Sequence, residues 1–348
     1  MEKWQWQRNA KLGLYGKGRR LYTNAKVNGK TYKDKNIKQQ RKDILNNYKK
    51  DIINNYNYAV IMTVKNEYPH IKKVLECLIN QSMKPGQVIV YDDDSTDYTY
   101  EVLNEMKREF ELRNIKFEIH IDYSYKKHPN YFHRLANNLN KIEKKIDPKY
   151  KYLMKLDGDV LLPVHYVFNL FEEFNLDPGL GSISGNIQSI DYQTMSFIPN
   201  PKRYNHYPLG AAMIFKRNIL DYHEGYPVYP ASDTVINLTS EFLYRKVKMS
   251  FAPEVTFYQV RATSSRQKGS ISYSTAIKHY YLNYPHILTY AYLLKSSPFS
   301  VFKYTKFLLF NQPKDKSQIL SDPGLNKYNL TRLKKHKLAR YILWLVNK

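Results

Sequence analysis

The stretch KYLMKLDGDVLLP, residues 151–163, ends an apolar run with two carboxylates, Asp157 and Asp159, that are one residue apart. Side chains along a strand alternate between its two faces, so an Asp-x-Asp pair at the carboxyl tip of a strand points both carboxylates the same way. Two carboxylates held in this manner repel each other unless a positive group lies near them. The pattern therefore predicts a strand that ends in a cation-binding crevice.

Short apolar segments and amphipathic segments alternate on both sides of this stretch. The pattern predicts strands over 58–64, 87–91, 116–121, 152–156 and 181–187, helices that span 71–79, 102–110 and 132–142, and a further helix after Pro163. Ser95 or Thr96 is expected to cap the second of these helices. Strands and helices in alternation are typical of α/β proteins in which helices cover both faces of a mostly parallel sheet.

Polar residues follow three of the predicted strands at the point where each strand ends. These are 65–67, with sequence KNE, 92–95, with sequence DDDS, and 157–159, with sequence DGD. In parallel sheets, ligands bind in the crevice beyond the carboxyl ends of the strands. We therefore expect the three groups to face one ligand.

A divalent cation would suit the carboxylates of Asp157 and Asp159. Mg²⁺ and Mn²⁺ are bound through one or two carboxylates while substrate phosphates and water supply the remaining ligands. Asp-Gly-Asp is also common in turns, so the motif alone is open to a purely structural interpretation.

Four short motifs occur in order along this pattern, namely TVKNE at 63–67, YDDDSTD at 91–97, LANNLN at 135–140 and LDGD at 156–159. Together they resemble the successive landmarks of the GT-A glycosyltransferases, specifically family 2. The resemblance covers roughly residues 57–265. It departs from the family at Asp94, which stands where the family usually has glycine.

The resemblance implies an inverting, metal-dependent transfer of a sugar from a nucleoside diphosphate to an acceptor hydroxyl. It implies a nucleotide-sugar site made by Thr63, Glu67, Asp92, Asp93, Arg134, Asp157, Arg261 and Arg266, with Mn²⁺ or Mg²⁺ held by Asp157 and Asp159. The donor would be UDP-, GDP- or dTDP-linked, and the acceptor a glycan, a lipid-linked sugar or a protein. As general base the family uses an Asp or Glu that opens a helix after a Gly-aromatic loop, which here is Asp233, with Glu241 as second choice.

Simpler roles remain open for several of these residues. Asp92, Asp93 and Ser95 could cap the following helix, as Ser232 and Asp233 could cap theirs. The three arginines could be ordinary surface side chains.

The net charge of +24 is concentrated at the two ends of the chain. Residues 1–56 carry 15 Lys and Arg against 4 Asp and Glu, and residues 312–348 carry 9 against 2. Residues 271–311 add four lysines and no acidic residue, so residues 57–270 are nearly neutral. We therefore predict a basic arm over 1–56, a catalytic domain over 57–270 and a basic helical extension over 271–348. The last residues, 333–348, form a basic amphipathic pattern that could lie on an anionic membrane, or could pack on the protein itself.

No apolar run of about 18 residues and no signal-peptide pattern is present, so we expect a cytoplasmic protein, with peripheral attachment to the cytoplasmic face of the membrane as the alternative location. A nucleic-acid-binding protein is the main alternative from another class, but it gives no reason for acidic groups at three strand ends. Nucleotidyl transfer is disfavoured because VKNEYPH, residues 64–70, lacks the glycine-rich loop. A catalytically silent scaffold of the same fold remains open.

Overall fold

The computed structural model describes residues 46–47, 49–52, 56–123, 131–194, 196–198, 207–228, 231–260, 271–312 and 319–333. Most of the predicted basic arm and most of the predicted membrane-binding segment, 334–348, therefore lie outside the described residues.

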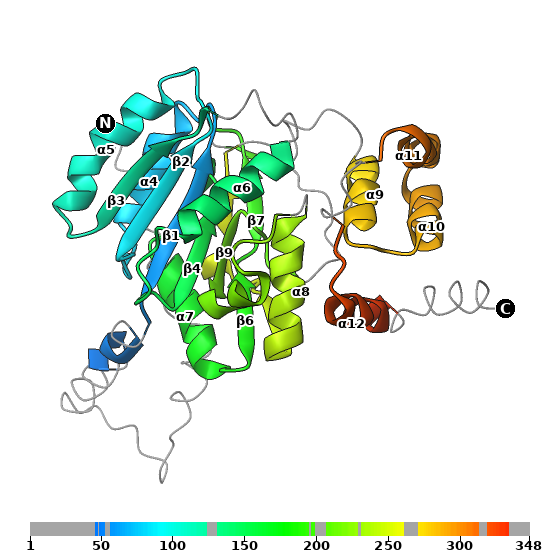
Figure 1. Ribbon diagram of the computed structural model, residues 1–348. Coiled ribbons are helices and arrows are strands. Elements are labelled where there is room, and N and C mark those ends of the chain that lie inside the picture. Colours follow the sequence, from blue (N-terminus) through cyan, green and yellow to red (C-terminus); the bar gives the residue numbers. More distant parts are fainter. Residues whose placement is uncertain are drawn as a thin grey trace, which may run out of the picture.

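A seven-stranded sheet forms the centre of the molecule, with strand order β10-β6-β9-β4-β1-β2-β3 (Figure 1). Its strands are β1 (Tyr58–Val64), β2 (Gln87–Asp92), β3 (Lys116–Ile121), β4 (Tyr152–Leu156), β6 (Leu180–Ser184), β9 (Ala212–Lys216) and β10 (Lys246–Met249). Neighbouring strands are parallel except that β9 runs antiparallel to both β4 and β6. The predicted α/β class with a mixed, mostly parallel sheet is thus confirmed.

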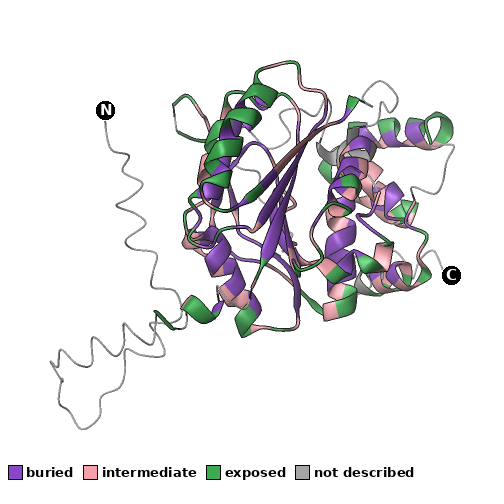
Figure 2. Ribbon diagram, turned by 60° about the vertical axis from the view of Figure 1, so that its left-hand side comes forward, coloured by how far each residue is buried: buried purple, intermediate pink, exposed green. Residues whose placement is uncertain are grey.

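Helices cover both faces of this sheet. They are α4 (His70–Ile79), α5 (Thr99–Glu111), α6 (Tyr131–Glu143), α7 (Tyr166–Leu176) and α8 (Ser232–Tyr244). Apolar side chains of β1 alternate between two cores: Val60 and Met62 pack in the core beneath α4, α5 and α7, and Ala59 and Ile61 in the core beneath α6. Figure 2 shows the resulting burial of the central strands. Because both faces are covered, the central strands are mostly apolar, which makes their sequences easy to recognise.

A smaller sheet lies beside the first, with strand order β5-β11-β7-β8. It contains β5 (Val160–Leu161), β7 (Ile187–Ile190), β8 (Phe197–Ile198) and β11 (Phe257–Gln259). The single strand predicted over 181–187 is wrong, because the chain leaves one sheet after Ser184 and enters the other at Ile187. Each half pairs with a different distant segment: β6 with β10 and β7 with β11.

The described C-terminal part is helical. It contains α9 (Ile271–Tyr281), α10 (His286–Ser296), α11 (Pro298–Phe310) and α12 (Pro323–Leu333). The first three pack together around a cluster that includes Tyr281, Tyr304 and Phe307. Three leucines of this part, Leu282, Leu320 and Leu325, pack with Val235 and Leu238 of α8.

Candidate functional site

The sheet brings the three polar strand ends side by side. Strands β4, β1 and β2 are adjacent and parallel, with Ile61 paired to Lys155 and Thr63 paired to Tyr91. Neighbouring strands are about 4.8 Å apart, so the ends of β4 and β2 are separated by about 10 Å. Thr63 lies near the end of β1, between these two strand ends.

The loops that follow β1 and β2 are tied to each other. The backbone N–H of Asn66 donates to Ser95 Oγ at 2.9 Å, and the N–H of Thr96 donates to Asn66 Oδ1 at 2.8 Å. The prediction that Ser95 or Thr96 caps the next helix is wrong, because α5 begins only at Thr99 and both hydroxyls contact Asn66 instead. Their role is to hold the two loops in register at the edge of the crevice.

Two of the three consecutive aspartates shape the turn after β2. The Asp92 carboxylate is 1% exposed and accepts a hydrogen bond from the Ser95 N–H at 2.9 Å. Asp94 adopts a left-handed backbone conformation with φ of 57°. Aspartate tolerates this conformation better than most residues do, which explains how it replaces the glycine that the resemblance leads one to expect.

Asp93 is the carboxylate of this group that is placed to bind a ligand. Its Oδ2 accepts a hydrogen bond from Arg134 Nε at 3.3 Å, and Lys65 Nζ lies 4.0 Å from the same oxygen. Its Oδ1 is buried and has no hydrogen-bond partner in the described part of the chain. Burial raises the pKa of Asp93, and Arg134 and Lys65 offset this only in part. A ligand N–H or O–H donor at Oδ1 would satisfy the buried acceptor.

Glu67 joins the end of β1 to the Asp-Gly-Asp turn. Its side chain is buried and lies so close to Gly158 that a methyl group there would come within 2.8 Å of Glu67 Cγ. The glycine is therefore needed for close packing between the two strand ends. This contact confirms that the acidic groups after β1 and β4 converge.

A buried lysine lies between Asp157 and Asp233. Lys155 Nζ is 2.8 Å from Asp157 Oδ1 and 3.6 Å from Asp233 Oδ2, and it donates to the Gly210 carbonyl at 2.9 Å. The lysine is 3% exposed. Burial by itself lowers the pKa of Lys155, but the two carboxylates outweigh it and hold the pKa above its ordinary value. The lysine is therefore charged and neutralises part of the site's acidity.

Asp233 lies in the first turn of α8 and points at the end of β4. Its Oδ1 accepts a hydrogen bond from the Tyr226 hydroxyl at 3.1 Å. Gly210 allows this approach, since a methyl group at that position would lie 1.8 Å from Asp233 Oδ2. Neither Ser232 nor Asp233 caps α8, whose N-cap is Ala231.

Glu241, the second choice of base, is elsewhere. It accepts a hydrogen bond from the Tyr207 hydroxyl at 2.6 Å. It is eight residues beyond Asp233 on the same helix, or about 12 Å along the axis.

Asp157 and Asp159 fit a divalent cation as a two-carboxylate site. Asp157 has one oxygen against Lys155, and its side chain is 39% exposed, while Asp159 Oδ2 accepts a hydrogen bond from Gln259 Nε2 at 3.1 Å. Within the described residues, no group of three or more His, Cys, Asp or Glu side chains is arranged so that it could hold a metal ion. Two hard oxygen donors, with phosphate and water completing the shell, match the preference of Mg²⁺ and Mn²⁺.

Lys155 is the member of this site that sequence reasoning missed. The signal was present in the strand sequence YLMKL, where a lysine occupies a position expected to be buried. Such a lysine requires an acidic partner nearby. Arg261 and Arg266, which were predicted to close over the diphosphate, lie outside the described residues.

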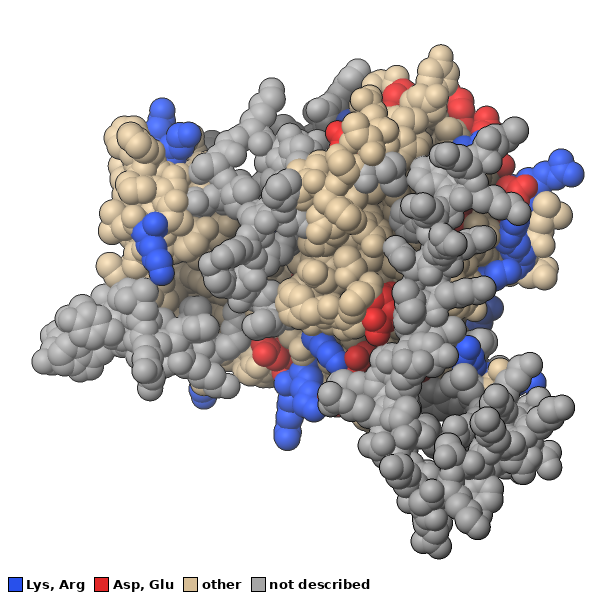
Figure 3. All heavy atoms as spheres, turned by 180° about the vertical axis from the view of Figure 1, so that it is seen from behind, with Lys and Arg blue, Asp and Glu red and all other residues tan. Residues whose placement is uncertain are grey.

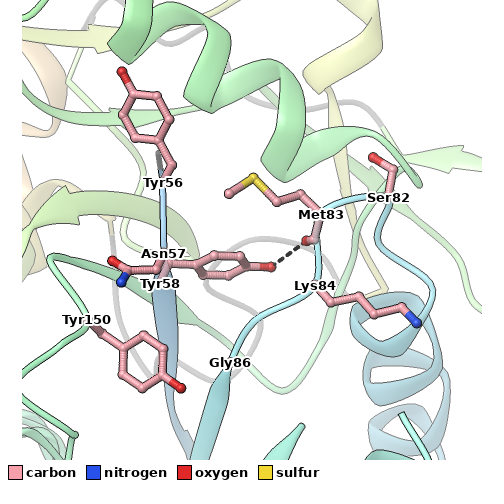
Figure 4. A pocket seen from close by; sticks show the side chains of 8 residues that line it. All are labelled: Tyr56, Asn57, Tyr58, Ser82, Met83, Lys84, Gly86 and Tyr150. Atoms are coloured by element: carbon pink, nitrogen blue, oxygen red, sulfur yellow. Dashed lines mark hydrogen bonds between the residues drawn. The ribbon is translucent and has the colours of Figure 1, made fainter. Parts of the chain in front are cut away.

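A separate hollow of about 370 Å³ lies at the other end of the strands from the candidate site, and Figure 4 shows the residues that line it. Tyr58, Met83, Gly86 and Tyr150 contribute to its lining, and the Tyr58 hydroxyl donates to the Met83 carbonyl at 2.8 Å. These residues are at the amino ends of β1 and β2, whereas ligands of parallel sheets bind at the carboxyl ends. The hollow is therefore distinct from the candidate site.

Comparison with known proteins gives a consistent result. A model of the family described as Glycosyl transferase family 2 matches residues 59–234, about half of the chain. Poly-beta-1,6-N-acetyl-D-glucosamine synthase of Staphylococcus epidermidis is 24% identical over 149 residues, which are 39% of this chain and 33% of that protein. The chain thus spans about a third of the length of the curated relatives that it matches.

Solved structures resemble this fold at low sequence identity. The mannosyltransferase PcManGT of Pyrobaculum calidifontis, in complex with GDP-Man and Mn²⁺, has a TM-score of 0.50 and 17% identity, covering 82% of each chain. TarS 1–349 of S. aureus, in complex with UDP-GlcNAc, has a TM-score of 0.48 and 13% identity, covering 80% of this chain and 81% of that one. The likeness to PcManGT supports the expected GT-A arrangement.

Proposed function

The chain belongs to glycosyl transferase family 2, and from this premise we propose that it transfers a sugar from a nucleoside-diphosphate sugar to an acceptor hydroxyl, with inversion at the anomeric carbon. One observation carries the proposal: Lys155 holds the first carboxylate of the Asp-Gly-Asp turn and the carboxylate at the start of α8 on the same ammonium group. In the role that we propose for each carboxylate, Asp157 would face the diphosphate and Asp233 the acceptor, and the lysine would hold the two side by side.

The nucleotide would lie across the ends of β1 and β2. Asp93 Oδ1 would accept a hydrogen bond from the base or the ribose, because it is a buried acceptor that has no partner in the described part of the chain. Arg134 orients this carboxylate from the other side. Thr63 and Glu67 would form the floor between the nucleotide and the diphosphate. Asp92 supports the turn rather than contacting the ligand.

Asp157 and Asp159 would hold Mn²⁺ or Mg²⁺ at the diphosphate. When bound, the cation offsets the negative charge that develops on the leaving nucleoside diphosphate. Lys155 has a complementary role in the protein itself, since its charge keeps Asp157 and Asp233 close without mutual repulsion.

Asp233 would act as the general base. Its Oδ2 would accept the proton of the acceptor hydroxyl as that oxygen attacks the anomeric carbon and the bond to the diphosphate breaks. The Tyr226 hydroxyl holds Oδ1 and so fixes the orientation of the carboxylate. The acceptor would be a glycan, a lipid-linked sugar or a protein.

Calorimetric titration of UDP, GDP and dTDP, each with and without Mn²⁺, tests the donor site. We expect one nucleotide to bind the wild type in the presence of Mn²⁺, and this binding to be lost in Asp157→Asn and in Asp159→Asn. Asp233→Asn should keep it, because that carboxylate serves the acceptor. Asp177→Asn, which changes an exposed carboxylate paired with Lys246, is the matched control.

Failure of all three nucleotides to bind a folded wild type would refute the proposal and favour a catalytically silent scaffold. Binding that does not depend on Mn²⁺ or on either aspartate would refute the metal site alone.

A further inference from the structure

Helix α11 (Pro298–Phe310) presents large apolar side chains to solvent. Phe299 is 89% exposed, Phe302 77%, Leu309 67% and Phe310 75%. At about 100° per residue these four side chains fall within an arc of about 120° on the helix. They therefore form a continuous apolar face rather than scattered exposed residues, which would need no explanation.

The same face carries positive charge. Lys303 and Lys306 are exposed and fall within the same arc. On the neighbouring helix α10 (His286–Ser296), Leu294 is 62% exposed and Lys295 is exposed as well. The sequence from 271 to 311 contains four lysines and no Asp or Glu. In Figure 3 this part of the molecule, at the left of the view, shows blue lysines on a tan surface and no acidic side chain.

The side of α11 opposite the exposed face is already packed against neighbouring helices. Ser300, Tyr304 and Phe307 are buried against α9 and α10, and Tyr304 accepts or donates a hydrogen bond with His286 Nδ1 at 3.0 Å. The helix thus already has a satisfied packing face. The exposed phenylalanines form a second apolar face, left over once the three helices have packed.

We propose that the exposed face of α11, with the adjoining end of α10, is a docking surface for a lipid bilayer that carries anionic headgroups. Phenylalanine and leucine side chains would enter the boundary between headgroups and acyl chains, and the lysines would contact the anionic headgroups. Long lysine stems can lie along the apolar surface while their charged ends reach the headgroup layer.

The helix would lie on the bilayer rather than cross it. With 13 residues, α11 is about 20 Å long, which is shorter than the hydrocarbon core of about 30 Å. No helix in the described ranges is both long enough and apolar enough to span a membrane.

A second copy of the chain fits this face less well than a bilayer does. Two such faces opposed would bring lysines against lysines. One side of two helices of 11 and 13 residues, each about 10 Å wide, offers roughly 400 Å². A stable dimer usually buries about 800 Å² on each partner. An anionic bilayer would attract the lysines instead of repelling them, and its binding does not require about 800 Å² of protein surface on each partner.

Vesicle flotation with the full chain tests the proposal, using phosphatidylcholine vesicles with and without phosphatidylglycerol. The variant Phe299→Ser/Phe302→Ser/Phe310→Ser leaves the net charge unchanged, and we expect it to bind phosphatidylglycerol vesicles at least about tenfold more weakly than the wild type. The control Leu112→Ser/Leu176→Ser removes two leucines, 67% and 66% exposed, that lie away from this surface, and it should bind as the wild type does.

The basic ends of the chain can bind anionic vesicles by charge alone. The triple phenylalanine variant keeps the net charge of the wild type, so a loss of binding in it would come from the apolar face of α11. If the phenylalanine variant binds like the leucine control, or if the wild type binds no vesicles, the proposal is overturned.

The variant Lys295→Gln/Lys303→Gln/Lys306→Gln tests the contribution of the positive charge. It should bind phosphatidylglycerol vesicles more weakly than the wild type does, with little change in its binding to phosphatidylcholine vesicles. Sedimentation velocity without lipid should show a monomer. A dimer that the serine substitutions dissociate would assign the face to a second copy and overturn the proposal.

Discussion

Replacing Lys155 by methionine should destabilise the protein measurably, because it removes the one ammonium group seen between two carboxylates in the described site. Methionine has a similar length and fits an apolar site, so the change acts mainly on charge. Asp157 Oδ1 and Asp233 Oδ2 lie 2.8 and 3.6 Å from the same Nζ. They are therefore at most roughly 6 Å apart, where two unit charges repel by about 3 kcal/mol at an effective dielectric of about 20.

Solvent reduces this figure, since the two carboxylates are 39% and 37% exposed. We take the remaining repulsion as about 2 kcal/mol, and the lost hydrogen bonds to Asp157 and to the Gly210 carbonyl add about 1 kcal/mol more. The expected loss in the free energy of unfolding is therefore about 3 kcal/mol. For a catalytic region of this size that corresponds to a fall in Tm of about 6–12 °C.

Circular dichroism in urea and on heating is the suitable assay. The control is Lys246→Met, which removes a lysine that is 61% exposed and 2.6 Å from Asp177. Exposed pairs contribute less than about 1 kcal/mol, so this variant should unfold almost as the wild type does. Equal stability of Lys155→Met and Lys246→Met would refute the reasoning.

Two further changes test the arrangement around Asp233 and the buried histidines. Tyr226→Phe removes the hydroxyl that holds Asp233 Oδ1, so kcat should fall about tenfold with little change in the KM for the donor, and an unchanged kcat would show that the contact is only structural. Burial lowers the pKa of His223 and of His279 to about 4. In the unfolded chain these two histidines take up protons below about pH 6.5, whereas in the folded protein they remain neutral down to about pH 4. The free energy of unfolding should therefore decrease as the pH falls from about 6.5 to 4, by up to about 1.4 kcal/mol per pH unit for each histidine. Urea unfolding of His279→Phe across this range should show a shallower slope, and a slope equal to that of the wild type would contradict the assignment.

Much of the central sheet could be predicted from sequence because its strands are buried on both sides. The segments over 58–64 and 152–156 were predicted with the bounds that the structure shows. Their apolar runs are short, are bounded by polar loops, and need no knowledge of distant residues. The convergence of the strand ends followed from the same reasoning, since parallel strands present their carboxyl ends at one edge.

The features that sequence reasoning did not find depend on contacts between distant segments. The division of 181–187 into β6 and β7 is decided by pairing with β10 and β11, more than 60 residues away. The insertion of antiparallel β9 between β4 and β6 is likewise a long-range choice. Lys155 was overlooked because its two partners are Asp157, two residues away, and Asp233, on another element altogether.

Helix α8 packs against two parts of the molecule, one on each side. One side packs on β6 of the central sheet, and the other, through Val235 and Leu238, packs on Leu282, Leu320 and Leu325 of the C-terminal part. A shortened protein that ends before residue 271 would expose this second side to water, next to the carboxylate at the start of the helix. The C-terminal helices therefore cannot be treated as a detachable tether, and any version prepared for activity measurements should retain them through residue 333.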